Sequence, residues 1–267
     1  MKNSDFRKFY QSRNPYKMTA FDDYVKNQPT SSGYINPYIL EERELHVTQL
    51  DIFSRLMMDR IIVFATEVDT VSASVCVSQL LYLDNAEPGR DITMYILSPG
   101  GSVYDGGAIL DTMDLIKSDV STVNTGLAAS YGAVLLCSGT KGKRYSLKHA
   151  RTMIHQPLGG TRGQASDIEI EAKEILKIKK ELCQVIAENT GKSLEEVIID
   201  CDRDNWMDCY ESLNYGTLGL VDAIITKDGE ITRESLGTKK EESKTKTAKT
   251  RKPKAKKEES KPEEKNE

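Results

Sequence analysis

The sequence predicts an α/β fold built around a largely parallel sheet. Three short runs of apolar, β-prone residues are typical of buried strands, and they occupy Ile61–Ala65, Ile92–Leu97 and Val120–Thr125. A helical pattern follows each run, and the starts of the runs are separated by 31 and 28 residues. Strands that alternate with helices at this spacing form βαβ units, whose crossovers are right-handed.

The helices that follow the three strands are expected at Val71–Leu83, Ile109–Ile116 and Ser130–Cys137. Two shorter β-like runs come next along the chain, at Lys143–Leu147 and Thr152–Ile154. We expect these two runs to form a further pair of strands.

A long amphipathic helix is predicted after these strands. The pattern from Ser166 to Glu169 is typical of a capping box, in which the serine caps the helix and the glutamate reaches back. Apolar residues then recur every three or four positions, at Ile168, Ala172, Ile175, Ile178, Leu182 and Ile186. Gly191 is a natural stop, so about 24 helical residues would extend ~36 Å. This length suggests a helix that projects and mediates assembly, although packing along the core is also compatible with it.

The chain divides into three parts by composition. Residues 1–33 are polar and aperiodic, which is typical of a leader or propeptide, and residues 34–236 carry the periodic signals of one folded domain. Residues 237–267 hold 12 basic and 7 acidic side chains with no large apolar residue, so we expect a disordered tail. A lysine-rich tail can bind nucleic acid, but the interspersed glutamates favour a solvated segment.

Composition excludes several classes of protein. The formal net charge of −4 argues against a nucleic-acid binder, and no run approaches the ~20 apolar residues of a membrane span. The first thirty residues contain no apolar signal-peptide core. The cysteine count of five is odd and no Cys-x-x-Cys occurs, so neither a disulfide framework nor a metal site is expected. These features favour the reducing cytoplasm.

A candidate nucleophile follows the third strand. Ser130 lies between the small residues Ala128 and Gly132 at the start of an apolar helix, a pattern that resembles a nucleophile elbow. A serine in that position is exposed where the helix dipole favours developing negative charge. Taken alone, the same pattern fits an ordinary serine N-cap better.

A glycine turn follows the second strand and could supply hydrogen-bond donors. The segment Ser98-Pro99-Gly100-Gly101 combines a proline with two glycines, and its open N–H groups could hold an oxyanion. It also fits a plain connection. No Gly-x-x-x-x-Gly-Lys-Ser/Thr loop occurs in the chain, so we expect neither an ATP site nor another cofactor.

A base and a carboxylate are available later in the chain. Only three histidines occur, and His155 stands at the edge of a predicted strand just before Pro157. Asp204 lies in an acidic run after a helix, where it could orient a histidine, and Trp206 would shield such a carboxylate from water. A lone histidine at a strand edge is more often structural, and an acidic run is usually a solvated cap. The order along the chain is therefore oxyanion loop, serine, histidine, aspartate.

These motifs resemble the family of Clp protease proteolytic subunits very closely, from about Asn36 to Ile225. The matching segments are Ser98-Pro99-Gly100-Gly101, Ala128-Ala129-Ser130, Met153-Ile154-His155-Gln156-Pro157, Gln164–Ile170 and Arg203-Asp204. The separations agree as well, with 32 residues from Ser98 to Ser130, 25 to His155 and 49 to Asp204. Two positions depart from the family pattern: Leu97 replaces an asparagine and Tyr131 replaces a methionine.

The resemblance implies a crotonase-like α/β fold and a serine endopeptidase of the self-compartmentalising type. In this family Ser130 would be the nucleophile, His155 the general base and Asp204 the orienting carboxylate. The N–H groups of Gly101 and Tyr131 would form the oxyanion hole.

The resemblance also implies an assembly. Two seven-membered rings would stack around a closed chamber, with the long helix from Ser166 as the handle that joins them and Arg203 near that interface. A separate ATP-driven unfoldase ring would feed unfolded proteins into the chamber, and it would dock on apolar side chains at Tyr95, Leu115 and Tyr145.

Three other readings compete with this one. A crotonase-like acyl-CoA enzyme shares the fold but does not require the set Ser130, His155 and Asp204. A catalytically dead scaffold subunit usually lacks triad residues, whereas all three are present here. An enzyme with a Ser–Lys dyad, like a signal-peptide peptidase, is disfavoured because no membrane anchor occurs and His155 is in register.

Overall fold

The computed structural model describes residues 38–43, 46–160 and 162–235. The predicted leader 1–33 and tail 237–267 lie outside these ranges. The chain divides into two compact units, residues 1–52 and 53–267. In the first unit, β1 (Tyr38–Arg43) and β2 (His46–Asp51) form an antiparallel hairpin with Tyr38 opposite Asp51.

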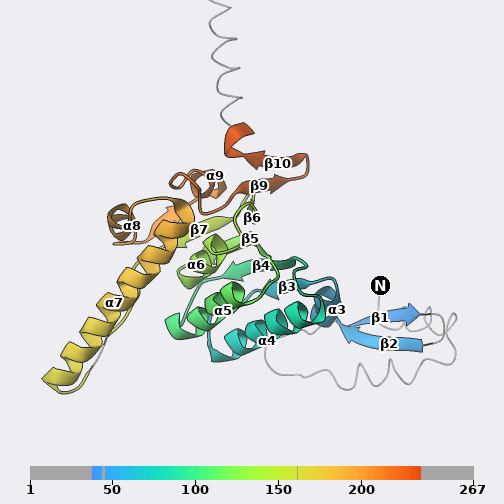
Figure 1. Ribbon diagram of the computed structural model, residues 1–267, viewed down its shortest axis with the longest axis horizontal. Helices are drawn as coiled ribbons and strands as arrows, with labels where there is room; N and C mark the ends of the chain where they lie inside the picture. Colours follow the sequence, from blue (N-terminus) through green and yellow to red (C-terminus); the bar gives the residue numbers. More distant parts are fainter. Residues whose placement is uncertain (1–37, 44–45, 161, 236–267) are drawn as a thin grey trace, which may run out of the picture. The chain divides into compact units, whose positions relative to one another are not determined.

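The second unit is built on an eight-stranded sheet (Figure 1). Its main path runs β10-β9-β6-β5-β4-β3, and β7 and β8 branch from β5. The strands are β3 (Ile61–Phe64), β4 (Ile92–Ser98), β5 (Val120–Ala129), β6 (Arg144–Leu147), β7 (Arg151–Ile154), β8 (Asn205–Met207), β9 (Ala223–Thr226) and β10 (Gly229–Thr232). All pairs from β3 to β9 along the path are parallel, which confirms the predicted α/β class.

The two short strands expected after Cys137 exist, but they do not pair with each other. β6 pairs with the first half of β5, where Val123 lies opposite Tyr145, and β7 pairs with the second half, where Ala129 lies opposite Met153. The physical reason is the length of β5, whose ten residues offer one edge to two strands in succession. This arrangement carries β7 to the carboxyl end of β5.

Helices follow the strands as the βαβ pattern requires. They are α3 (Ile52–Met58), α4 (Thr70–Ala86), α5 (Val103–Leu115), α6 (Tyr131–Cys137), α7 (Ala165–Thr190), α8 (Leu194–Asp200) and α9 (Cys209–Leu213). α4 and α5 lie side by side against the sheet (Figure 1). Every residue of α6 is buried, which explains its unbroken apolar sequence.

The long helix α7 is confirmed, but its predicted cap is wrong. The helix begins at Ala165 with Gln164 as the N-cap, and no side chain caps it. Ser166 therefore lies inside the first turn, where its hydroxyl cannot act as an N-cap. Glu169 instead pairs with Lys173 one turn further on, at 2.7 Å. The structure thus starts the helix before the residue that the capping-box pattern favours.

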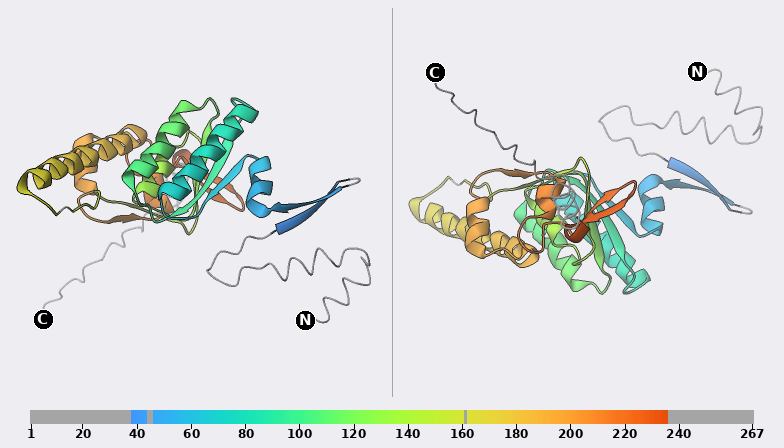
Figure 2. Two further views of the ribbon diagram at one scale, coloured as in Figure 1. Left: turned by 90° about the horizontal axis from the view of Figure 1, so that it is seen from below. Right: turned by 90° about the horizontal axis from the view of Figure 1, so that it is seen from above.

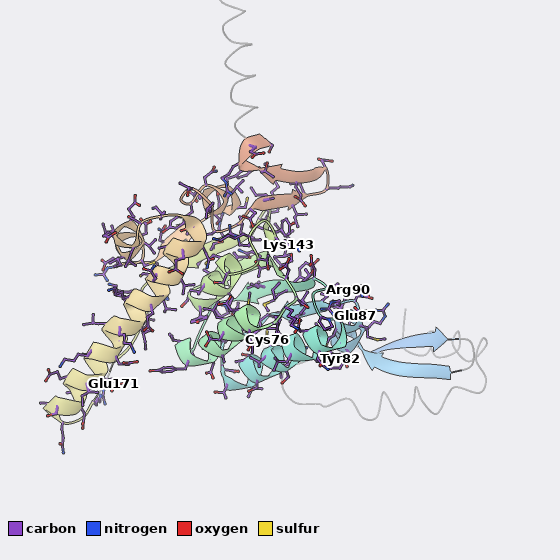
Figure 3. The ribbon with its side chains drawn as sticks, in the orientation of Figure 1. Cys76, Tyr82, Glu87, Arg90, Lys143 and Glu171 are labelled. Atoms are coloured by element: carbon purple, nitrogen blue, oxygen red, sulfur yellow. The ribbon has the colours of Figure 1, made fainter. Side chains whose placement is uncertain are left out.

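Only the C-terminal part of α7 packs on the core. Its buried side chains lie between Cys183 and Thr190, whereas Ile168 and Leu176 are 41% and 65% exposed. The first turns project away from the sheet, as Figures 1 and 2 show, and Glu171 marks this end in Figure 3. The apolar stripe predicted from the sequence therefore continues beyond the surface that covers it.

All five cysteines are buried free thiols, at positions 76, 137, 183, 201 and 209. Within the described ranges, no helix combines the length and the apolar character that crossing a bilayer demands.

Candidate active site

Ser130 lies at a strained turn between β5 and α6. Its φ of 53° is positive, which is rare for a residue with a side chain and is typical of the elbow that presents a nucleophile. The N–H of Ser130 donates to the carbonyl of Met153 on β7 at 2.9 Å, which ties the turn to the neighbouring strand. Ser130 occupies the N-cap position of α6, but its side chain makes no capping hydrogen bond, which is compatible with the elbow interpretation.

The glycine turn after β4 passes directly beside this serine. Gly100 has a φ of 88°, and a Cβ placed on it would come within 2.6 Å of the Cβ of Ser130. Val68 holds the turn from the other side: its N–H donates to the carbonyl of Gly100 at 2.9 Å and its carbonyl accepts from Ser102 at 2.8 Å. The close approach therefore requires glycine at position 100.

Two N–H groups beside Ser130 have no acceptor among the described residues. One belongs to Gly101, which lies between the two hydrogen bonds that Val68 makes with its neighbours. The other belongs to Tyr131, the first residue of α6, whose N–H has no partner within the helix. Unpaired donors on both sides of a serine are what an oxyanion requires.

Strand register brings the histidine and the aspartate together across 49 residues. β7 and β8 are antiparallel with Ile154 opposite Asn205, so the next pair along the ladder is His155 and Asp204. Because β7 also pairs with β5, all three side chains meet where β5 and β7 end and β8 begins.

The three side chains form a hydrogen-bonded chain. Nε2 of His155 lies 2.9 Å from Oγ of Ser130, and Nδ1 lies 3.2 Å from Oδ1 of Asp204. With Nδ1 protonated, the imidazole donates to the carboxylate and its Nε2 can accept the serine proton. This arrangement has the parts of a nucleophile, a general base and an orienting carboxylate.

The expected shielding by Trp206 is wrong for the single chain. The Asp204 side chain is 60% exposed and Trp206 is itself 54% exposed. Trp206 lies opposite Met153, two positions along β8 from the carboxylate, and it does not cover Asp204.

Sequence reasoning missed a residue that links the histidine segment to the aspartate segment. The N–H of Gln156 donates to the carbonyl of Cys201 at 2.6 Å, and its side-chain amide donates to the carbonyl of Asp202 at 2.9 Å. Lys179 on α7 donates to the side-chain amide oxygen Oε1 of Gln156 at 2.7 Å. The sequence signals were the position of Gln156 after His155 and its place in a matched motif, neither of which reveals these partners.

A cavity of about 250 Å³ opens beside Ser130 and His155. Apolar side chains from α6, β7 and α7 contribute to its wall, including Val134, Ile154 and Leu182. The thiol-bearing residues Cys183 and Cys201 also line it. An apolar cavity next to a nucleophile can receive an apolar side chain of a substrate.

The described part of the chain contains no cluster of three metal-ligating side chains.

Comparisons with known proteins identify the family to which the chain belongs. A family model described as Clp protease matches residues 43–228. The chain is 54% identical over 223 residues to an ATP-dependent Clp protease proteolytic subunit of Bacteroides fragilis (strain YCH46), covering 84% of this chain and 99% of that protein. It is 53% identical over 225 residues to the protein of the same name from Porphyromonas gingivalis, covering 84% and 99%. The chain therefore belongs to the Clp protease family and is a serine endopeptidase.

Proposed function

We propose that Ser130, His155 and Asp204 are the catalytic triad of this endopeptidase, acting on peptide bonds of unfolded proteins. The observation that carries the proposal is the continuous hydrogen-bonded chain from the serine hydroxyl through the imidazole to the carboxylate. The strained backbone of Ser130 supports it, because strain of this kind is typical of functional sites.

In the proposed mechanism, Oγ of Ser130 attacks the carbonyl carbon of the substrate while Nε2 of His155 takes its proton. The N–H groups of Gly101 and Tyr131 stabilise the oxyanion that forms. His155 then gives the proton to the leaving amine, and a water molecule releases the acyl group by the same steps in reverse. Asp204 stabilises the imidazolium in both halves of the reaction.

Labelling with a fluorophosphonate tests the assignment of the nucleophile. We expect one adduct per chain, located on Ser130 by peptide mapping, because only an activated serine reacts with such a reagent. His155→Ala should abolish the labelling, since it removes the base but leaves the serine. An adduct on another serine, or undiminished labelling of the His155 variant, would contradict the assignment.

We also propose that the chain assembles as two stacked heptameric rings joined through α7. Supporting this, the projecting half of α7 exposes apolar side chains, of which Ile168 belongs to the same stripe as the buried Ile186. Burial of this exposed apolar surface by a second copy of the chain would stabilise the assembly, by roughly 25 cal/mol per Å² of apolar surface removed from water. Arg203 is exposed and donates only to the carbonyl of the adjacent Asp202 in the described part of the chain, so it is available for a contact across rings.

Charges placed on exposed apolar side chains of the projecting half of α7 should split the rings. We expect the double variant Ile168→Asp and Leu176→Asp to sediment as single rings, because the proposed interface between the rings would bury unpaired carboxylates. Peptide turnover should fall by about tenfold or more if this interface holds Asp204 in place. Ile175 is unsuitable for this test because it already packs against Gly159 within the chain.

The matched control is Lys173→Gln with Lys177→Gln, which changes the net charge by the same amount on the polar face of α7. Both lysines form exposed i,i+4 ion pairs, which contribute little to stability. This control should retain the double ring and its activity. If the Asp double variant formed single rings with full specific activity, catalysis would not depend on the stacking of the rings.

An ATPase is the partner of a subunit of this type, and we propose an unfoldase ring that docks on apolar side chains of the sheet. Tyr95 and Tyr145 flank Val123 in the same register across three parallel strands, so they emerge on one face. Both are partly exposed, and Leu115 at the end of α5 is largely exposed.

The cytoplasm is the compartment that we propose. Five buried free thiols are compatible with a reducing environment, in which they would persist.

A further inference from the structure

Two of the buried thiols lie together at the wall of the cavity beside Ser130. Cys183 belongs to α7 and Cys201 follows α8, and the two helices pack against each other. Both residues line the cavity, and each thiol lies close enough to the other to shift its pKa. A small oxidant that enters the cavity therefore meets two adjacent sulfur atoms.

The segment that contains Cys201 is joined to both ends of the histidine–aspartate pair. Its carbonyl accepts the N–H of Gln156, the residue after His155, at 2.6 Å. Asp204 follows only three residues later. A displacement of Cys201 toward α7 therefore acts on the base and on the carboxylate at once.

The two thiols differ in acidity, which assigns their order of reaction. The neighbouring Cys201 thiol lowers the pKa of the Cys183 thiol, and the nearby Lys179 ammonium lowers it further. The neighbouring Cys183 thiol, followed by burial, raises the pKa of Cys201. The more acidic thiol is the one that reacts with an oxidant first.

We propose that Cys183 and Cys201 form a reversible disulfide under peroxide and that this disulfide lowers the activity of the neighbouring site. The thiolate of Cys183 attacks one oxygen of hydrogen peroxide; an S–O bond forms, the O–O bond breaks and hydroxide leaves, taking up a proton to become water. The sulfur of Cys201 then attacks the sulfenic sulfur as its thiol loses its proton. The S–S bond forms, the S–O bond breaks and a second water leaves. In total, two thiols are oxidised by two electrons and one peroxide is reduced to two waters.

The effect on turnover rests on the proposed function, whereas the disulfide itself does not. A disulfide brings the sulfur atoms to about 2.05 Å, closer than two unlinked thiols, so one segment must move. The cavity wall and the carbonyl that holds Gln156 then shift together. A misplacement of about 1 Å in a catalytic site can cost on the order of 10²-fold in rate.

The test treats the full-length protein with hydrogen peroxide and follows two readouts. Peptide mapping after alkylation should find Cys183 linked to Cys201, and cleavage of a short peptide should fall by about tenfold or more. Dithiothreitol should restore both the free thiols and the rate. Sulfinic acid at Cys183 without the cross-link, or a rate that dithiothreitol cannot restore, would overturn the proposed switch.

Variants are compared by the ratio of treated to untreated rates, so a change in basal activity does not enter. Cys201→Ser and Cys183→Ser should each lose the reversible response. The control Cys209→Ser should retain it, because Cys209 is a buried thiol that donates to the carbonyl of Lys148 and a hydroxyl can replace it. A mapped disulfide with unchanged turnover would overturn the regulatory effect while leaving the triad untouched. Loss of fluorophosphonate labelling at Ser130 in untreated protein would instead point to a failure of the proposed function.

Discussion

Replacing Ser130 by alanine should lower the kcat for a short peptide by about 10⁴-fold or more. Oγ of Ser130 is the only hydroxyl that contacts Nε2 of His155 in the described part of the chain, so the variant leaves the base with nothing to activate. The two unpaired N–H groups of Gly101 and Tyr131 remain, and they should support a small residual rate. Turnover of a fluorogenic peptide at saturating concentration measures the loss.

The proposed triad should also behave as one unit. The double variant Ser130→Ala with His155→Ala should be no slower than Ser130→Ala alone, because removal of either member already disables the shared step. Ser138→Ala is the matched control, since its hydroxyl accepts from Asn189 away from the site. It should cleave at nearly the wild-type rate. Undiminished turnover by a correctly assembled Ser130 variant would remove this residue from the mechanism.

The strands and the candidate nucleophile could be predicted because local sequence patterns determine them. β3, β4 and β5 are short apolar runs followed by helices, and such runs are recognisable without tertiary information. Ser130 could be singled out because the elbow needs small neighbours on both sides. The family resemblance then connected Ser130 with His155 and Asp204, which no local pattern joins.

Long-range register escaped prediction. The contact between His155 and Asp204 depends on Ile154 lying opposite Asn205, and nothing local to β7 or β8 fixes that pairing. The exposure of Asp204 was not predicted either, because Trp206 lies two positions further along β8 and leaves the carboxylate exposed. The start of α7 was misplaced for a related reason: a capping pattern states which residue can cap a helix, whereas the surrounding chain decides where the helix begins.

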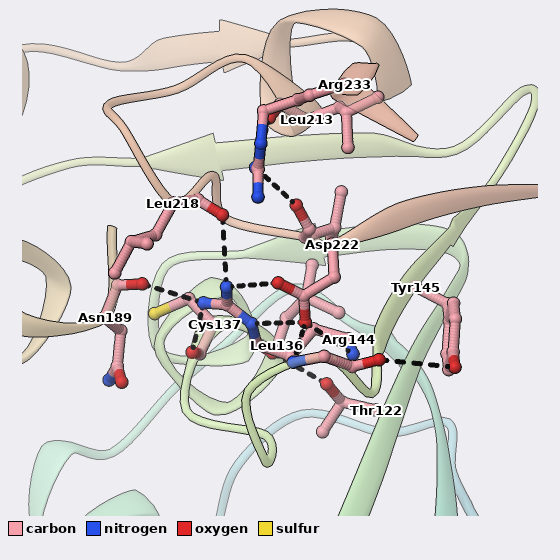
Figure 4. Close-up of polar contacts among 12 residues, drawn as sticks. Thr122, Leu136, Cys137, Arg144, Tyr145, Asn189, Leu213, Leu218, Asp222 and Arg233 are labelled. Atoms are coloured by element: carbon pink, nitrogen blue, oxygen red, sulfur yellow. Dashed lines mark hydrogen bonds and ion pairs between the residues drawn. The ribbon is translucent and has the colours of Figure 1, made fainter. Parts of the chain in front are cut away.

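A second large effect is expected far from the site, at a buried arginine. Arg144 on β6 is 1% exposed and pairs with Asp222 through two hydrogen bonds, Nε to Oδ2 at 2.9 Å and Nη2 to Oδ1 at 2.6 Å (Figure 4). Its other donors reach the carbonyls of Cys137, Asn189 and Leu218. The guanidinium therefore joins α6, α7 and the segment before β9.

The adjacent residue offers a natural contrast. Lys143, labelled in Figure 3, also forms two ion pairs, with Asp91 at 2.6 Å and Asp119 at 2.8 Å. Its side chain is 32% exposed and its partners about half exposed. Water screens such pairs, so each contributes at most about 1 kcal/mol. Lys143 and Arg144 are thus adjacent in the chain and carry the same charge, but only Arg144 is buried.

The lowered pKa of Asp222 sets the pH dependence of the Arg144 pair. Burial alone would raise the pKa of Asp222, but the hydrogen bonds and charge of Arg144 outweigh it and hold that pKa below its usual value. A carboxyl with a lowered pKa stabilises the fold above its unfolded pKa of about 3.9, and this stabilisation is lost as the pH falls through the folded pKa. The contribution of the pair should therefore be full at neutral pH and shrink in acid.

Arg144→Met should lower the free energy of unfolding by about 3–5 kcal/mol at neutral pH, because Asp222 stays buried without its cation. Lys143→Met should cost at most about 1 kcal/mol per ion pair. Adding Asp222→Asn to Arg144→Met should recover part of the loss, since the unpaired charge is removed while an oxygen remains to accept from Gly142. Below about pH 4 the difference in the free energy of unfolding between wild type and Arg144→Met should narrow.

Urea unfolding at one fixed protomer concentration measures the free energy of unfolding of the wild type and the three variants. Equal losses for Arg144→Met and Lys143→Met, or a gap that widens in acid, would show that burial of the Arg144–Asp222 pair does not determine its effect.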